Sequence, residues 1–118
     1  MKRIKEYNFV VFSIAAIFAA LLRWQIDDIY YVNCIGCFLL GLVNTLNLSK
    51  KYQLIYGFAF CGSLTTFSGW MLQLYELIST GFTLLFLVNV LKFVFSGTLA
   101  VCLGKLLGQK IKKLTLSR

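Results

Sequence analysis

The chain has 118 residues, of which 59% are hydrophobic and only 14% are charged, and its mean hydropathy is +0.81. This composition is too apolar for a soluble globular domain and predicts a membrane protein. With four acidic residues and no histidine, the chain lacks the groups for a histidine-based triad or for paired-carboxylate hydrolysis, and no zinc site can be argued, so we do not expect an enzyme.

Four apolar segments follow one another along the chain, at residues 9–24, 29–48, 54–78 and 82–107. Each is close to the roughly 20 residues that cross a hydrocarbon core of about 30 Å as a helix. The connections between them are too short to hold a soluble domain. The sequence therefore predicts one all-α transmembrane domain over residues 1–118, with four transmembrane helices and a basic cytoplasmic tail at 108–118. The first segment has no small-residue cleavage pattern, so we expect a retained span rather than a signal peptide.

Basic residues gather at one end of these spans. That end holds both termini and the connection between the second and third spans, and it collects Lys2, Arg3, Lys5, Lys50, Lys51, Lys105, Lys110, Lys112, Lys113 and Arg118. The opposite end has Arg23 together with the acids Asp27, Asp28 and Glu76. Because Lys and Arg in short loops are held in the cytoplasm during insertion, we expect both termini there. The basic groups also attract anionic membrane lipid, and they flank spans rather than form a nucleic-acid surface.

The third segment contains an unusual run of small and hydroxyl residues at 62–68 (GSLTTFS). Proline is absent from the chain, so a break in this helix has to be made by glycine and hydroxyl side chains. The run predicts a broken third helix near the bilayer centre, with freed carbonyls that face protein or an ion. Close helix packing at small residues is the alternative explanation. A second small-residue pair, Gly104 and Gly108, fits a close helix contact near the membrane edge.

Other polar residues also fall inside spans, where unsatisfied polar groups are costly. Asn33 lies in the second span, and Asn89 and Lys92 lie in the fourth. We expect these groups to face each other, a partner chain or a water-filled path. Lys92 is a candidate for an electrostatic or vestibule role, through an anion or an acidic group of a partner, and a snorkelling or deprotonated side chain at lipid is the alternative. Arg23, at the end of the first span, is a second vestibule candidate, with an interfacial anchor as the simpler role.

Three motifs in these spans resemble the bacterial fluoride channels of the Fluc/CrcB family. Residues 58–68 (FAFCGSLTTFS) are similar to the highly specific signature around that family's broken third helix. Residues 32–41 (VNCIGCFLLG) resemble the second-helix pattern, in which Asn is followed by Gly, Phe and Gly at fixed steps. Residues 19–24 (AALLRW) resemble the end of the first helix, and four spans in a chain of this length agree with the family too.

The resemblance implies an antiparallel dimer of inverted subunits in the bacterial inner membrane, with two narrow pathways that export fluoride passively and reduce its cytoplasmic concentration. It also implies a structural sodium ion at the dimer centre, held by the backbone carbonyls of Gly62 and Thr65. The implied pathway residues are Asn33, Phe67, Ser68 and Trp70. An asparagine amide can donate hydrogen bonds to an anion that is losing water, and the partly positive edges of aromatic rings can line its route.

The chain also departs from the family pattern at four positions. Trp70 stands where the family repeats Phe, and Gly69 stands where Thr is common. Ile29 replaces a hydroxyl residue, and Gln73 replaces a frequent Glu. We expect these changes to degrade at least one of the two pathways. A chain that builds its own inverted dimer has to insert in both orientations, whereas the charge bias here fixes one, so we expect a heterodimer with a related subunit of opposite bias rather than a homodimer.

Two other functions compete with a conducting subunit. A non-conducting scaffold for a channel partner would keep the fold while losing the pathway. A small four-helix multidrug or cation exporter would need an intramembrane carboxylate in its first helix, and residues 9–24 contain none.

Overall fold

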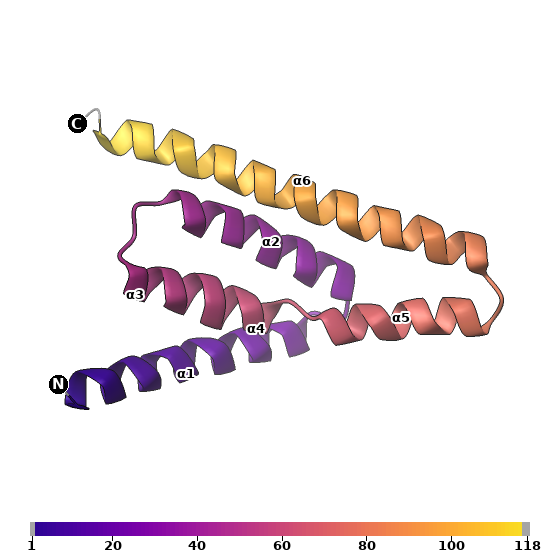
Figure 1. Cartoon of the computed structure of the whole chain (residues 1–118), viewed down its shortest axis with the longest axis horizontal. Coiled ribbons are helices and arrows are strands. Elements are labelled where there is room, and N and C mark those ends of the chain that lie inside the picture. The colour runs from indigo at the N-terminus through magenta and orange to yellow at the C-terminus, as the bar shows by residue number, and fades with distance from the viewer. Residues whose placement is uncertain (1, 117–118) are drawn as a thin grey trace.

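The computed structural model describes residues 2–116, and their side chains from Asn8 onward. Every element in this range is helical: α1 (Lys2–Gln25), α2 (Ile29–Thr45), α3 (Lys50–Gln53), the π-helix η1 (Leu54–Cys61), α4 (Gly62–Leu64), α5 (Phe67–Ser79) and α6 (Thr83–Leu116). The elements α3, η1 and α4 follow one another without a gap, so they and α5 form the two halves of the predicted broken third helix (Figure 1).

The two halves of the molecule along its long axis are unequal. In one half, α1, α2, the α3–η1–α4 rod and α6 run side by side, whereas the other half contains only the hairpin of α5 and α6 (Figure 1). The helix break lies at the boundary, beside the turn between α1 and α2. One half of the molecule is therefore a bundle of four elements, whereas the other half consists of two helices with no further helix packed beside them in the described part of the chain.

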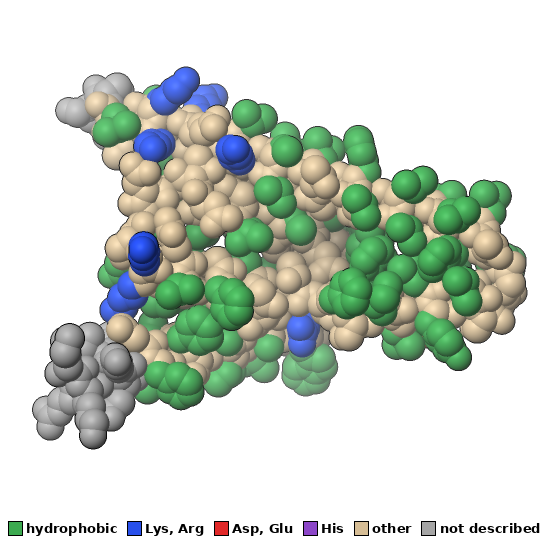
Figure 2. All heavy atoms as spheres, in the orientation of Figure 1, with side chains coloured by type: hydrophobic (Ala, Val, Ile, Leu, Met, Phe, Trp, Pro, Cys, Tyr) green, Lys and Arg blue, Asp and Glu red, His purple; other side chains and the backbone are tan. Residues whose placement is uncertain are grey.

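The surface has the character of a membrane protein. The buried core is small and centres on Ala19, Val32 and Leu64, while large apolar side chains are exposed along all the long helices. Two stretches, Asn8–Gln25 and Thr83–Leu116, are long and apolar enough to cross a membrane, and α2 is a shorter apolar helix. Together with the helical architecture, these features confirm the predicted all-α membrane fold. Most basic side chains on the visible face gather at the end where α6 finishes and α3 begins, one more lies midway along the molecule, and apolar side chains are spread over the rest (Figure 2).

Several helix boundaries differ from the segments expected from hydropathy, since α1 already begins at Lys2 and the third helix at Lys50. Helix α2 ends at Thr45 because Leu46 adopts an extended backbone (φ −71°, ψ 134°). Helix α6 continues through the basic stretch expected as a tail and reaches Leu116, since no residue there interrupts a helix. Its last turns are also tied to the bundle, because Lys112 Nζ donates to Asn47 Oδ1 at 3.0 Å.

Helices α2 and α6 approach each other closely because glycines lie at their contact. A Cβ added at Gly104 would collide with the carbonyl oxygen of Phe38, and one added at Gly41 would collide with the carbonyl oxygen of Val101. Gly108 extends this contact by one helical turn and is buried as well. The close contact expected at Gly104 and Gly108 is therefore present, and it joins the two helices along the four-element half.

Candidate functional site

The third helix is interrupted at two residues whose backbone leaves the helical region. Thr65 has φ −77° and ψ 153°, and Thr66 has φ −138° and ψ 118°, whereas Gly62 is still helical at φ −66° and ψ −33°. The break thus lies three residues after the glycine that opens the predicted run. The Thr66 side chain then caps α5 by accepting from Gly69 N at 3.2 Å. Hydroxyl residues therefore terminate one helix and begin the next.

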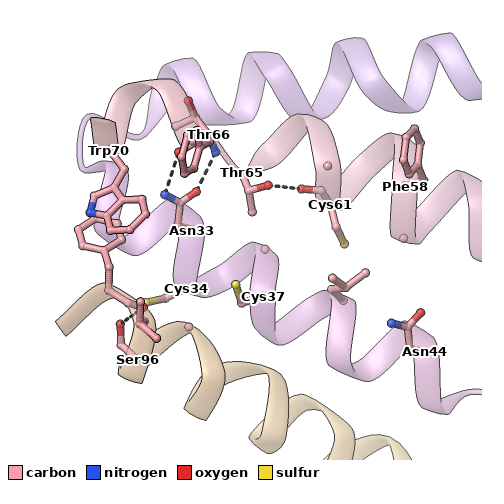
Figure 3. A pocket seen from close by; sticks show the side chains of 18 of the residues that line it. Asn33, Cys34, Cys37, Asn44, Phe58, Cys61, Thr65, Thr66, Trp70 and Ser96 are labelled. Atoms are coloured by element: carbon pink, nitrogen blue, oxygen red, sulfur yellow. Dashed lines mark hydrogen bonds between the residues drawn. The ribbon is translucent and has the colours of Figure 1, made fainter. Parts of the chain in front are cut away.

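Asn33 fixes the break through both ends of its side-chain amide. Its Oδ1 accepts from Thr66 N at 2.8 Å, and its Nδ2 donates to the Thr66 carbonyl at 3.1 Å (Figure 3). In an unbroken helix the Thr66 N–H would bond the Gly62 carbonyl, so this arrangement removes that carbonyl's helical donor. The second Nδ2 hydrogen of Asn33 remains available for another acceptor.

Arg23 contacts the break from α1. Its Nη1 donates to the Ser63 carbonyl at 3.1 Å and approaches the Thr65 carbonyl at 3.5 Å. The side chain is half-buried and does not extend away from the bundle as an interfacial anchor would. Arg23 thus satisfies carbonyls at the end of α4 and positions the break, which hydropathy alone does not indicate.

A groove of about 850 Å³ runs along the chain between α2, the α3–η1–α4 rod and α6. It brings together five of the predicted site residues: Asn33, Gly62, Thr65, Phe67 and Trp70. The same groove is lined by Phe93, Ser96 and Gly97 of α6, which the sequence motifs do not single out. Between the ends of the groove, Cys37 of α2 and Cys61 of η1 line it from different walls (Figure 3). The two predicted sodium ligands and three of the four predicted pathway residues therefore share one surface.

Three predicted residues lie outside this groove. Ser68 is exposed, and its Oγ lies 3.2 Å from Thr66 Oγ1. Arg23 contacts the break from α1, as described above, and does not line the groove. Lys92 lines a separate recess of about 500 Å³, so the structure does not bring it to the helix break.

A chain of aromatic rings connects the groove to the Lys92 recess. Phe67 meets Trp70 edge-to-face at 5.8 Å, and Trp70 stacks on Phe93 at 5.0 Å between centroids. Phe93 in turn meets Tyr30 edge-to-face at 5.3 Å, and Lys92 Nζ lies 4.1 Å from the centre of the Tyr30 ring. Phe93 lines both cavities, so its ring lies between them.

The Lys92 recess carries charges of both signs. Besides Lys92 it is lined by Asp28 and Glu76, and by the amides of Gln73 and Asn89. The Asp28 carboxylate is already used, because its Oδ1 accepts from Tyr30 N at 2.8 Å and caps α2. With two carboxylates and one ammonium, the recess is a poorer place for an anion than its lysine alone suggests.

Two of the departures from the family pattern face each other. A Cβ added at Gly69 would lie only 2.8 Å from Ile29 Cδ1. The larger apolar side chain at position 29 therefore occupies the space that a larger residue at position 69 would need. These two substitutions belong together as one packing change beside the N-terminus of α5.

The break also offers carbonyl oxygens suited to a hard cation. The Gly62 carbonyl has lost its helical donor, and an added Cβ at Gly62 would meet nothing within 4 Å, so this residue faces open space on the chain's own surface. The Thr65 carbonyl has a single long contact with Arg23. Two carbonyls are fewer than the about six oxygens that small hard cations take, so the two do not complete such a site by themselves.

Comparisons with known proteins agree with this architecture. Residues 10–105 match the family described as "CrcB-like protein, Camphor Resistance (CrcB)". The chain is 47% identical over 108 residues to "Fluoride-specific ion channel FluC 1" of Prochlorococcus marinus (strain NATL2A), an alignment that covers 92% of this chain and 95% of that protein. It is 41% identical over 119 residues to "Fluoride-specific ion channel FluC 2" of Synechococcus sp. (strain CC9902), with 92% and 85% covered. Similarity extends to "Fluoride-specific ion channel FluC" of Methanococcus aeolicus, at 27% identity over 117 residues.

Proposed function

Since this chain belongs to the CrcB family, we propose that it is one subunit of a fluoride-specific ion channel that passively exports fluoride across the bacterial inner membrane. The observation that carries the proposal is the single groove in which Asn33, Phe67 and Trp70 lie with the helix break. No covalent chemistry is needed for this function, because a channel has only to replace the water around an ion and release the ion again.

Fluoride would pass along this groove by exchanging water for the donors and ring edges that line it. The second Nδ2 hydrogen of Asn33 is one neutral donor among the predicted pathway residues. The Phe67 side chain is 70% exposed, so its ring stands at the rim, where a second subunit would complete the wall. Trp70 widens this aromatic lining, and its Nε1 is buried without a hydrogen-bond partner among the described residues.

The unequal halves of the chain support assembly with an inverted partner. Suppose that a second subunit lies antiparallel, with its helix break beside the break of this chain. Its four-element half would then lie beside the α5–α6 hairpin of this chain, and its own α5–α6 hairpin would lie beside the four-element half of this chain. Each leaflet would then hold a similar number of helices. The charge bias of this chain favours a related subunit of opposite bias as that partner, and the names FluC 1 and FluC 2 of the relatives fit paired subunits.

A sodium ion at the centre of such a dimer would be held by the Gly62 and Thr65 carbonyls of this chain and by their counterparts. Unwound backbone that lines a protein interior is a common way to coordinate this ion in membrane proteins. The ion would stabilise the contact between the two helix breaks and would take no part in fluoride conduction. Both termini would lie in the cytoplasm on this arrangement.

Fluoride efflux from proteoliposomes tests the function and the pairing together. We expect this chain reconstituted with a related subunit of opposite loop charge to release trapped fluoride, measured with a fluoride electrode, and to retain chloride. This chain alone is expected to give little flux, because its copies insert with one orientation and cannot form the inverted pair. Robust flux from the chain alone would rule out the obligatory heterodimer, and the absence of flux from the pair would rule out the channel.

Sodium dependence gives a separate test of the central ion. We expect the thermal unfolding midpoint of the assembled dimer to fall when sodium is replaced by N-methylglucamine at constant ionic strength. A ligand at about 100 times its dissociation constant stabilises the folded state by roughly 2.7 kcal/mol, so the shift should be easily measured and should follow the sodium concentration. An unfolding midpoint that is the same in both cations would contradict a sodium ion at the breaks.

The two rival functions differ from this proposal in measurable ways. A scaffold subunit would support flux even when its own groove is blocked, so the Asn33 variant described in the Discussion distinguishes it. A proton-coupled cation exporter would need an intramembrane carboxylate, and residues 9–24, the apolar part of α1, contain no acid.

A further inference from the structure

The groove extends to the basic end of the molecule. Its lining there consists of Asn44 at the last turn of α2 together with Lys50 and Gln53 of α3. Asn44 lies at the far end of α2 from Asn33, with Cys37 and Cys61 between them (Figure 3). A continuous surface therefore leads from two exposed amides and one ammonium to the helix break.

The charge at this mouth is of one sign. Lys50 is the only charged residue among those that line the groove within the described part of the chain. The acids Asp28 and Glu76 line the recess beyond Phe93 instead, on the other side of the break. The cavities on the two sides of the break thus differ in charge. The groove carries one positive residue, and the recess carries charges of both signs.

We propose that Lys50, flanked by the amides of Asn44 and Gln53, forms the cytoplasmic mouth of the anion route and raises the local fluoride concentration there. This inference rests on the proposed function. A lysine at the entrance of a low-dielectric groove attracts anions over a distance set by the Debye length, which is about 30 Å at 0.01 M salt and about 3 Å at 1 M. Lys50 acts through this field as a positioning residue and does not coordinate the ion within the narrow part of the route.

Because the mouth lies at one face of the membrane, Lys50 should affect fluoride that enters from that face and not fluoride that enters from the other. Lys50 lies at the end where both termini are expected, and fluoride that enters from that side meets the lysine before it reaches Asn33. Fluoride that enters from the opposite side passes the narrow region first. Removal of the Lys50 charge should therefore lower entry from one side alone and make the channel rectify.

The experiment compares Lys50→Gln with Lys51→Gln in the assembled pair. Both variants remove one lysine from α3, but Lys51 does not line the groove, and its Nζ lies 5.9 Å from the centre of the Tyr52 ring. The two changes should affect membrane orientation equally. Fluoride currents are recorded across planar bilayers, with fluoride on each side in turn, at low salt and in about 1 M of an impermeant sodium salt.

At low salt we expect Lys50→Gln to reduce current from the Lys50 side roughly two- to fivefold, a fraction of the enhancement that a whole charged cleft provides. Lys50→Glu should reduce it further, and Lys50→Arg should preserve it. The difference should vanish in high salt and be absent for fluoride supplied from the other side.

Three results would overturn the inference. They are a Lys50→Gln current equal to wild type at low salt, a reduction that Lys51→Gln matches, and a reduction that persists in high salt. A wild-type pair that carries no fluoride in either direction would overturn the proposed function and this inference together. A conducting pair that Lys50→Gln leaves unchanged would overturn the inference alone.

Discussion

Replacement of Asn33 by leucine is expected to abolish fluoride conduction while leaving the protein folded well enough to purify. The side chain makes both hydrogen bonds that hold the Thr66 backbone, and it supplies the free N–H that faces the groove. Leucine removes all three. A hydrogen bond to a charged group contributes about 1.5–3 kcal/mol, which corresponds to roughly 10- to 100-fold in flux before any change in the break is counted.

Asn33→Asp separates the two roles of this amide. The carboxylate can still accept from the Thr66 N–H, but it cannot donate to the Thr66 carbonyl, and it places a negative charge in the anion's route. We therefore expect Asn33→Asp to fold better than Asn33→Leu and to conduct no better. Asn89→Ala is the matched control, because among the described residues Asn89 Nδ2 donates to the Leu85 carbonyl of its own helix alone. Normal fluoride efflux in Asn33→Leu proteoliposomes would exclude this groove as the pathway and favour the scaffold role.

Replacement of Gly104 by alanine is expected to destabilise the protein strongly. The new Cβ would collide with the Phe38 carbonyl oxygen, and it would also approach the backbone nitrogen of Leu42 at 3.0 Å. Backbone atoms cannot rotate away as a side chain can, so α2 and α6 must separate. Overpacking typically costs about 1–3 kcal/mol, which lowers an unfolding midpoint by roughly 5–20 °C for a domain of this size.

Gly97→Ala is the control for this change, since it adds the same group to the same helix. Its Cβ would meet only Cys37 Sγ at 3.6 Å, an ordinary van der Waals contact. Thermal unfolding in detergent, followed by the fluorescence of Trp24 and Trp70, measures both variants. If the two alanines lower the midpoint equally, the close α2–α6 contact is not what stabilises the bundle.

The number of helices and the position of the interruption follow from the sequence because they depend on local composition and on the thickness of a bilayer. Residues 62–68 combine glycine with hydroxyl side chains in an apolar span, and a break does occur within them. Its exact residues depend on a contact between distant segments, because Asn33 takes the Thr66 N–H and so ends the helix at Thr65 rather than at Gly62. No local pattern contains that information.

The lining of the groove is predictable only where a motif indicates it. Asn33, Phe67 and Trp70 stand at motif positions, and the structure places them together. Phe93 is one of 11 phenylalanines, so nothing in the sequence separates it from those that face lipid. The sequence predicts that Asn33, Asn89 and Lys92 face each other, a partner chain or a water-filled path, but Asn89 and Lys92 line a recess that is distinct from the groove containing Asn33. The paired change at Ile29 and Gly69 likewise becomes visible only when the two residues are seen in contact.

The wide winding of η1 implies that the length of this rod matters as much as its side chains. Over Leu54–Cys61 each turn takes more residues than in an α-helix, and two opposite sides of the segment are packed, with Gly57 against α2. Deletion of one residue here would let the segment form an α-helix instead of a π-helix. The residues after η1 would then be rotated about the helix axis. The Thr65 oxygen would then point away from Arg23. The spacing along this segment therefore matters for the position of the break as well as the identity of its side chains.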